Sequence, residues 1–272
     1  MTEQFQQLKA VVFDWAGTVI DHGCLAPAIV FQEIFRRRGI TVTPEQAREP
    51  MGMAKRAHIA AIAAMPEISA AWLQQHGEAC SEEQIDAMYA DFLPLQKQTL
   101  KDHSTLIDGA TEVVEWCRQR GLKIGSSTGY TRELMEVVSA SAAAQGYVPD
   151  CVLCSEDAPE GRPAPWLLHE AAKRMNVYPM WKIVKVDDTP VGIAAGRNAG
   201  CWTIGITRTG NGVGLSVGEL QKASVAAVTD LISKTEAKLR VAGAHYVVES
   251  VADIRSVLSE IEQRLAESHV PI

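Results

Sequence analysis

The fold of this chain is decided by the segment Lys9-Ala10-Val11-Val12-Phe13-Asp14-Trp15-Ala16-Gly17-Thr18. Its first half is apolar and rich in valine, which predicts a buried strand. Asp14 follows at the point where this strand gives way to a loop. In a parallel α/β sheet, ligands bind beyond the carboxyl ends of the strands, so Asp14 is a candidate catalytic carboxylate.

Strand-like and helix-like patterns alternate along most of the chain. The predicted strands are 11–14, 122–126, 151–154, 182–186, 202–206 and 245–248. The predicted helices between and after them are 112–120, 132–144, 166–175, 191–198 and 254–265. This alternation predicts an α/β fold with a doubly wound parallel sheet.

The motif Asp-Trp-Ala-Gly-Thr that begins at Asp14 resembles the nucleophile motif of the haloacid dehalogenase superfamily. Phosphatases of that superfamily carry Asp-x-Asp-x-Thr, in which the first Asp attacks phosphorus and the second protonates the departing alkoxide. Here the second position is Ala16. A site that has the nucleophile and lacks this acid suits a leaving group that needs no proton on oxygen.

Residues 21–100 break the alternation and carry only helix patterns. Capping boxes predict helix starts at Thr43 and at Ser81, each followed three residues later by Gln. A helical insert directly after the first strand resembles the cap domain that many members of the superfamily place over the active site. We therefore predict an α-helical cap domain at 21–100, and a Rossmann-like catalytic core formed by 1–20 and 101–272.

The composition is that of a globular protein, with 47% hydrophobic and 22% charged residues among 272. The net charge of −7 argues against nucleic-acid and anionic-membrane partners. No apolar run approaches the roughly 18 to 20 residues of a membrane helix, and the polar start lacks a signal-peptide pattern. We expect a cytoplasmic protein without disulfides, whose 6 cysteines are free thiols.

Two polar segments follow predicted strands and suit an anionic ligand. Thr128 and Gly129 end one strand and precede a helix, where backbone N–H groups and a hydroxyl can bind phosphate. The alternative is an ordinary helix cap. Arg162, before Pro163, stands where the superfamily usually carries a lysine that neutralises phosphate, and its alternative is a surface arginine in a loop.

The segment Val186-Asp187-Asp188-Thr189 ends another predicted strand and suggests a magnesium site. Asp188 and Asp14 would supply carboxylates, and the Ala16 carbonyl would supply a further oxygen. The alternative is that Asp188 caps the following helix. Many superfamily members carry another Asp four positions later, where this chain has Gly192. Asp187 is a candidate to compensate, although strand alternation predicts that its side chain points away from that of Asp188.

The glycine-rich segment Arg-Thr-Gly-Asn-Gly-Val-Gly at 208–214 does not match the dinucleotide-binding pattern. It also comes late in the chain. We predict a flexible loop near the carboxyl edge of the sheet.

Lys55 is the candidate nucleophile of the helical insert. It lies just after Pro50 and Gly52, between methionines and alanines, at a predicted helix start. Apolar burial and the positive end of a helix both favour a neutral amine. A neutral lysine can form an imine with a carbonyl substrate. The alternative is a surface lysine whose stem lies along an amphipathic helix.

Several motifs together resemble the phosphonoacetaldehyde hydrolase (phosphonatase) family of the superfamily. They are Asp14-Trp-Ala-Gly-Thr, Pro50-Met-Gly-Met-Ala-Lys55, Ser126-Ser-Thr-Gly-Tyr-Thr-Arg-Glu133, Gly161-Arg-Pro-Ala-Pro-Trp166 and Asn198-Ala-Gly-Cys-Trp-Thr203. The resemblance runs from about residue 9 to the C-terminal helix. It implies hydrolysis of the carbon–phosphorus bond of phosphonoacetaldehyde to acetaldehyde and phosphate.

The resemblance also implies how the residues act. Lys55 would form a Schiff base with the aldehyde, and Asp14 would form an aspartyl-phosphate. The resemblance further implies one Mg²⁺ per subunit and a homodimer. Cys24, Met51 and Tyr130 are pocket candidates. His58 is a candidate proton shuttle, or alternatively a histidine that packs in the core.

Two other functions remain open at this point. One is a phosphate-ester phosphatase of the same superfamily, against which Ala16 and Lys55 argue. The other is a noncatalytic phosphate-binding regulatory protein, against which the set of Asp14, Arg162 and Asp188 argues.

Overall fold

A single parallel sheet organises the chain, of which this computed structural model describes residues 4–271. Its six strands lie in the order β3-β2-β1-β4-β5-β6. They are β1 (Ala10–Phe13), β2 (Lys123–Ser127), β3 (Cys151–Leu153), β4 (Ile183–Asp187), β5 (Trp202–Ile206) and β6 (Tyr246–Val248). Every neighbouring pair is parallel. The predicted α/β fold with a doubly wound parallel sheet is confirmed.

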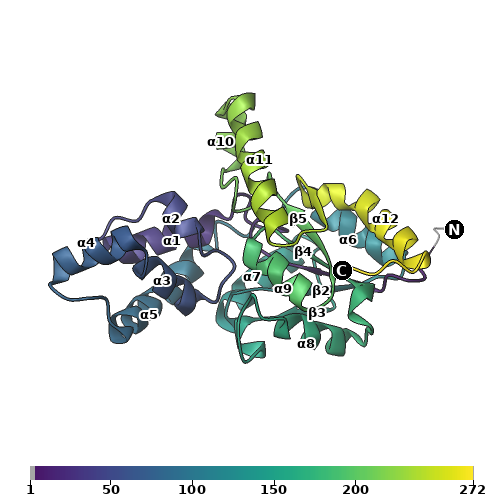
Figure 1. The fold of residues 1–272 in the computed structure, drawn as a ribbon, viewed down its shortest axis with the longest axis horizontal. Helices are drawn as coiled ribbons and strands as arrows, with labels where there is room; N and C mark the ends of the chain where they lie inside the picture. The colour runs from purple at the N-terminus through teal and green to yellow at the C-terminus, as the bar shows by residue number, and fades with distance from the viewer. Residues whose placement is uncertain (1–3, 272) are drawn as a thin grey trace.

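Helices cover both faces of this sheet (Figure 1). They are α6 (Ala110–Gln119), α7 (Arg132–Ala144), α8 (Trp166–Met175), α9 (Pro190–Asn198) and α12 (Ile254–Ala266). Val11 and Phe13 of β1 pack in a core that includes α6 and α12, whereas Ala10 and Val12 pack in a second core that includes α8 and α9. Successive side chains of β1 thus point to opposite faces of the sheet and pack in a different core on each face.

A helical insert lies between β1 and β2, at one end of the molecule (Figure 1). It consists of α1 (Leu25–Arg36), α2 (Pro44–Arg48), α3 (Lys55–Ala63), α4 (Pro66–His76) and α5 (Glu82–Thr99). Both predicted capping boxes are present, at Thr43 with Gln46 and at Ser81 with Gln84. The helical insert is therefore confirmed, and its assignment as a cap domain with the boundaries given above stays a prediction.

Two helices between β5 and β6 were not predicted. They are α10 (Val217–Lys222) and α11 (Val225–Val241), and α11 packs against α9, β5 and β6. In Figure 1 they project from the sheet. Over its 17 residues α11 buries only Val228, Thr235 and Leu239, and it leaves Val225 and Val241 exposed. Such a helix carries a weak apolar period, so the pattern does not reveal it.

Three short 3₁₀ helices complete the described elements: η1 (Ser155–Asp157), η2 (Met180–Lys182) and η3 (Val251–Asp253). The cysteines at positions 24, 80, 117, 151, 154 and 201 are free. Across residues 4–271, no helix combines the length and the apolar character that crossing a membrane requires.

Candidate active site

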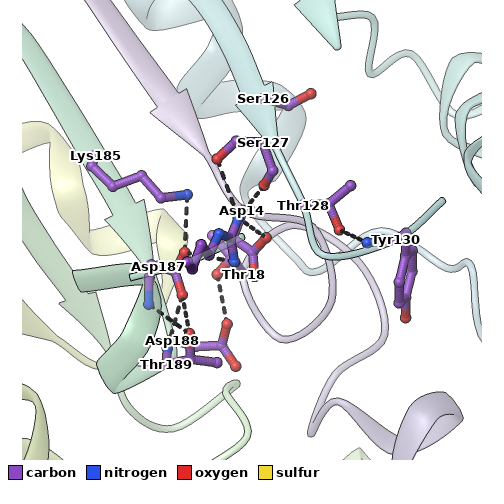
Figure 2. A network of polar contacts seen from close by, with 12 residues as sticks. Asp14, Thr18, Ser126, Ser127, Thr128, Tyr130, Lys185, Asp187, Asp188 and Thr189 are labelled. Atoms are coloured by element: carbon purple, nitrogen blue, oxygen red, sulfur yellow. Dashed lines mark hydrogen bonds and ion pairs between the residues drawn. The ribbon is translucent and has the colours of Figure 1, made fainter. Parts of the chain in front are cut away.

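The order of the strands places the candidate site. Starting from β1, the chain continues to β2 on one side and later to β4 on the other. Ligands of such sheets bind at this point, beyond the carboxyl ends of the strands. Asp14 follows β1, and Asp187 ends β4 with Asp188 directly after it. Figure 2 shows these three side chains converging there.

Asp14 is paired with Arg162 inside the protein. The two residues are 6% and 5% exposed, respectively. Arg162 Nη2 donates to Asp14 Oδ1 at 2.8 Å and also to the Ser127 carbonyl. Although burial opposes the charge, Asp14 and Asp187 together raise the pKa of Arg162. Arg162 is therefore a buried cation beside the candidate nucleophile, and the surface-arginine alternative does not apply.

Each carboxylate oxygen of Asp187 has its own partners. Its Oδ1 accepts hydrogen bonds from Thr189 N at 2.9 Å and Thr189 Oγ1 at 2.7 Å. Its Oδ2 forms close ion pairs, without hydrogen-bond geometry, with Lys185 Nζ at 2.9 Å and Arg162 Nη1 at 3.3 Å. Burial disfavours this carboxylate, but the Lys185 and Arg162 charges prevail and lower its pKa.

The expectation that Asp187 points away from Asp188 is wrong. Oxygen atoms of Asp14, Asp187 and Asp188 all lie within 4.8 Å of one another. Lys185 and Asp187 do share a face of β4, as strand alternation requires, but β4 ends at Asp187. The backbone leaves strand geometry there, so alternation no longer governs Asp188.

The space that Asp187 occupies is available because residue 192 is glycine. A Cβ atom built on Gly192 would lie 2.0 to 2.2 Å from the three carboxyl-group atoms of Asp187. A side chain at position 192 and the carboxylate of Asp187 therefore compete for one volume.

Asp188 is held at two of its oxygens. Thr18 Oγ1 donates to Oδ1 at 3.1 Å, and the backbone N–H of Asn211 donates to Oδ2 at 2.7 Å. The residue that caps α9 is Thr189, so the alternative that Asp188 is only a helix cap does not apply. Burial, with the charges of Asp14 and Asp187, raises the pKa of Asp188 well above its usual value.

These three buried carboxylates can hold a metal ion. Mg²⁺ prefers oxygen ligands, and a cation would relieve the repulsion that disfavours the charge on Asp188. The residues present therefore fit a divalent cation.

Lys55 reaches the site from the helical insert. It is the first residue of α3 and is only 5% exposed, so it is not a surface lysine. Its Nζ lies 4.7 Å from the ring centre of Tyr130 and 5.6 Å from that of Phe31. Burial lowers the pKa of Lys55 to about 8, against the opposing influence of Asp14. The neutral amine is thus accessible near neutral pH.

His58 lies behind Lys55, one helical turn along α3. Its Nε2 donates to the Ala47 carbonyl at 2.9 Å, and its ring stacks on Phe31 with centroids 3.7 Å apart. Burial and the Lys55 charge hold the pKa of His58 well below its ordinary value. His58 is a neutral, packed side chain and does not line the cavity described next.

A small cavity lies between the residues at the carboxyl edge of the sheet and the residues of the helical insert around Lys55. Its lining includes Asp14, Ala16, Cys24, Met51, Lys55, Thr128, Gly129, Tyr130 and Arg162, all candidates from the sequence. It also includes Pro27, Gly52 and Thr189, which sequence reasoning missed. The helix-cap alternative for Thr128 does not apply, because α7 is capped by Thr131. Thr128 Oγ1 instead accepts from Tyr130 N at 3.1 Å.

Two glycines let the insert approach the sheet at this cavity. A Cβ on Gly129 would lie 2.6 Å from the Met53 carbonyl oxygen, and one on Gly52 would lie 2.5 Å from Thr189 Oγ1. Because Gly52 also has φ +94°, a side chain there would be strained as well as crowded. The backbone of the insert therefore contacts the loop that follows β2 and the loop that follows β4.

Comparison with known proteins agrees with this geometry. Residues 8–200 match the family described as haloacid dehalogenase-like hydrolase. The phosphonoacetaldehyde hydrolase of Nitratidesulfovibrio vulgaris is 45% identical over 264 residues, covering 97% of this chain and 94% of that protein. The phosphonoacetaldehyde hydrolase of Paraburkholderia phytofirmans is 42% identical over 98% of this chain and 100% of its own.

The chain belongs to the phosphonoacetaldehyde hydrolase family.

A solved structure agrees with this assignment. The crystal structure of a phosphonoacetaldehyde hydrolase-like protein from Oleispira antarctica matches with a TM-score of 0.96 and 38% identity, covering 100% of this chain and 98% of that one. Membership of the phosphonoacetaldehyde hydrolase family confirms the resemblance drawn from the motifs around Asp14 and Lys55. The roles of the individual residues remain proposals.

Proposed function

We propose that this protein hydrolyses the carbon–phosphorus bond of phosphonoacetaldehyde and releases acetaldehyde and phosphate. The observation that carries the proposal is that a buried lysine amine, Lys55, and a buried carboxylate, Asp14, line one cavity. The curated relatives are named for this activity. Ala16, which provides no acid for an oxygen leaving group, supports carbon as the leaving atom.

Lys55 begins the reaction. Its neutral amine attacks the aldehyde carbon, and loss of water leaves an imine between Nζ and the substrate. The pKa of about 8 supports this step because an appreciable share of the amine is free at neutral pH. Once protonated, the imine can accept the electron pair of the bond that breaks.

Asp14 then attacks phosphorus. The electron pair of the carbon–phosphorus bond moves toward the imine nitrogen, so the carbon leaves as an enamine and not as a free carbanion. Water hydrolyses the aspartyl-phosphate, which frees phosphate and restores Asp14. The enamine takes up a proton on carbon, and a second water releases acetaldehyde from Lys55.

The remaining polar groups bind the phosphonate. Arg162, held against Asp14 at 2.8 Å, offers a guanidinium to the phosphonate oxygens, and Thr128 and Gly129 line the same cavity. Asp14, Asp188 and the Ala16 carbonyl would hold one Mg²⁺, which when bound neutralises the like charges of phosphonate and nucleophile.

The test is to trap the imine. Borohydride added with phosphonoacetaldehyde should inactivate the protein irreversibly, and mass spectrometry should locate the reduced adduct on Lys55. Lys55→Arg should lose nearly all turnover, because a guanidinium keeps the charge but cannot act as the amine nucleophile. A phosphonate that lacks the carbonyl should protect Lys55.

The outcomes separate the alternatives. An adduct confined to surface lysines, with phosphate esters turned over instead, would indicate an ordinary phosphatase. A noncatalytic phosphate-binding protein would turn over neither substrate. The homodimer stays a prediction, which the molecular mass in solution tests.

A further inference from the structure

Arg48, the last residue of α2, binds both the 208–214 loop of the core and the start of the helical insert through its guanidinium group. Its Nη1 donates to the Gly23 carbonyl at 2.7 Å and to Asn211 Oδ1 at 3.1 Å, and its Nη2 donates to the Gly214 carbonyl at 3.0 Å. In return, Asn211 Nδ2 donates to the Arg48 carbonyl at 3.0 Å. Arg48 and Asn211 therefore bind each other in both directions.

Asn211 also contacts the candidate metal site. Its side chain faces Arg48, while its backbone N–H donates to Asp188 Oδ2 at 2.7 Å. Asn211 is only 8% exposed. One residue thus joins the helical insert to the carboxylate of Asp188.

The glycine-rich segment 208–214 is built to fit between these two partners. A Cβ on Gly210 would lie 2.5 Å from Asp188 Cβ, and one on Gly214 would lie 2.8 Å from Arg48 Nε. Gly214 also has φ +67°, which favours glycine. The loop that follows β5 therefore packs closely on Asp188 at one end and on Arg48 at the other.

We propose that Arg48 and Asn211 are positioning residues that fix the Asp188 carboxylate when the helical insert closes on the sheet. This inference rests on the proposed function, in which Asp188 binds the metal. If the insert moves away, Asn211 loses the hydrogen bonds that its side chain makes with Arg48. The 208–214 loop is then held less firmly, and the Asn211 N–H is no longer fixed on Oδ2. The closure that brings Lys55 to the cavity thereby also orders the metal ligand.

Another contact between insert and core provides a matched control. Lys97 Nζ lies 3.0 Å from Glu133 Oε1, linking α5 to α7, with side chains 41% and 56% exposed. Neither residue contacts Asp14, Asp187 or Asp188 through any hydrogen bond or ion pair in the described part of the chain. Lys97→Met removes a link between insert and core without touching the loop.

The experiment measures Mn²⁺ binding to the full-length protein without substrate, by electron paramagnetic resonance of the free ion. Arg48→Met and Asn211→Ala should each raise the Kd for Mn²⁺ by roughly tenfold, within the range of coupling between linked sites. Asn211→Ala keeps the backbone N–H that binds Asp188. A loss of Mn²⁺ affinity in this variant therefore reports on the Asn211 side chain alone. The double variant should bind Mn²⁺ less weakly than the product of the two single losses predicts, because both variants remove the hydrogen bond between Arg48 Nη1 and Asn211 Oδ1.

The results decide between this inference and simpler accounts. Unchanged Mn²⁺ affinity in Asn211→Ala, or an equal loss in Lys97→Met, would overturn it. If Arg48→Met fails to fold, Asn211→Ala alone still decides. Failure of the proposed function would be seen separately, as absence of a trapped adduct on Lys55 in the wild-type protein.

Discussion

The lowered pKa of Lys55 makes a quantitative prediction about how imine formation depends on pH. With a pKa of about 8, roughly a tenth of the amine is neutral at pH 7. An ordinary lysine, with a pKa of about 10.4, would be neutral in only ~0.04% of molecules. Burial of Lys55 therefore increases the reactive form more than ~200-fold at this pH.

The assay is reductive trapping with acetaldehyde and cyanoborohydride between pH 6 and pH 10. Acetaldehyde carries no charge over this range, so the titration reports on the protein alone. Labelling of Lys55 should rise about ninefold from pH 6 to pH 7 and about fivefold from pH 7 to pH 8, and then level off. Labelling of exposed Lys97 in the same digest provides the reference. A rate at Lys55 that still rises tenfold per unit between pH 8 and pH 10 would refute the assignment.

Four other outcomes follow from the same site. Lys55→Met should raise the free energy of unfolding at pH 7 by ~3 kcal/mol, because it removes the cost of burying the charged Lys55 amine. In the wild-type protein this cost is fully present below about pH 8 and fades toward pH 10.5, so the stabilisation should fade over the same range. Thermal melts of both proteins at pH 7 and pH 10.5 check this. EDTA should abolish turnover, Mg²⁺ should restore it, and Asp188→Ala should behave like permanent chelation in the same assay. Ala16→Asp should lower turnover of phosphonoacetaldehyde, since it adds negative charge beside the phosphonate, and a gain in steady-state rate would contradict that role. Asp187→Gly should lose activity that Gly192→Asp restores in the double variant, because both side chains reach one volume.

The sequence predicted the sheet well because each strand is a short apolar run between helical patterns. The bounds of β5, α7 and α8 match the prediction to the residue. The helical insert was also predictable, since its capping boxes carry a local signal that needs no tertiary context. By contrast, α11 is stabilised by packing on few buried residues, so its pattern is weak.

The candidate site could be predicted only in part. Asp14, Lys55 and Asp188 stand at strand or helix ends, where sequence position alone suggests chemistry. The orientation of Asp187 depends on where β4 ends and on the space left by Gly192, which no local pattern reports. The link from Arg48 to Asn211 joins residues 163 positions apart, so only the folded chain reveals it.

The enclosure of Lys55 has a consequence for the protein between turnovers. The amine is buried between Phe31 of the helical insert and Tyr130 of the core, and neither part alone surrounds it. Separation of the two parts would return water to the amine and shift the pKa of Lys55 back toward that of an ordinary lysine. The amine would then be mostly protonated at neutral pH, and it would react more slowly with aldehydes. The high reactivity of Lys55 therefore depends on the contact between the insert and the core, and not on α3 alone.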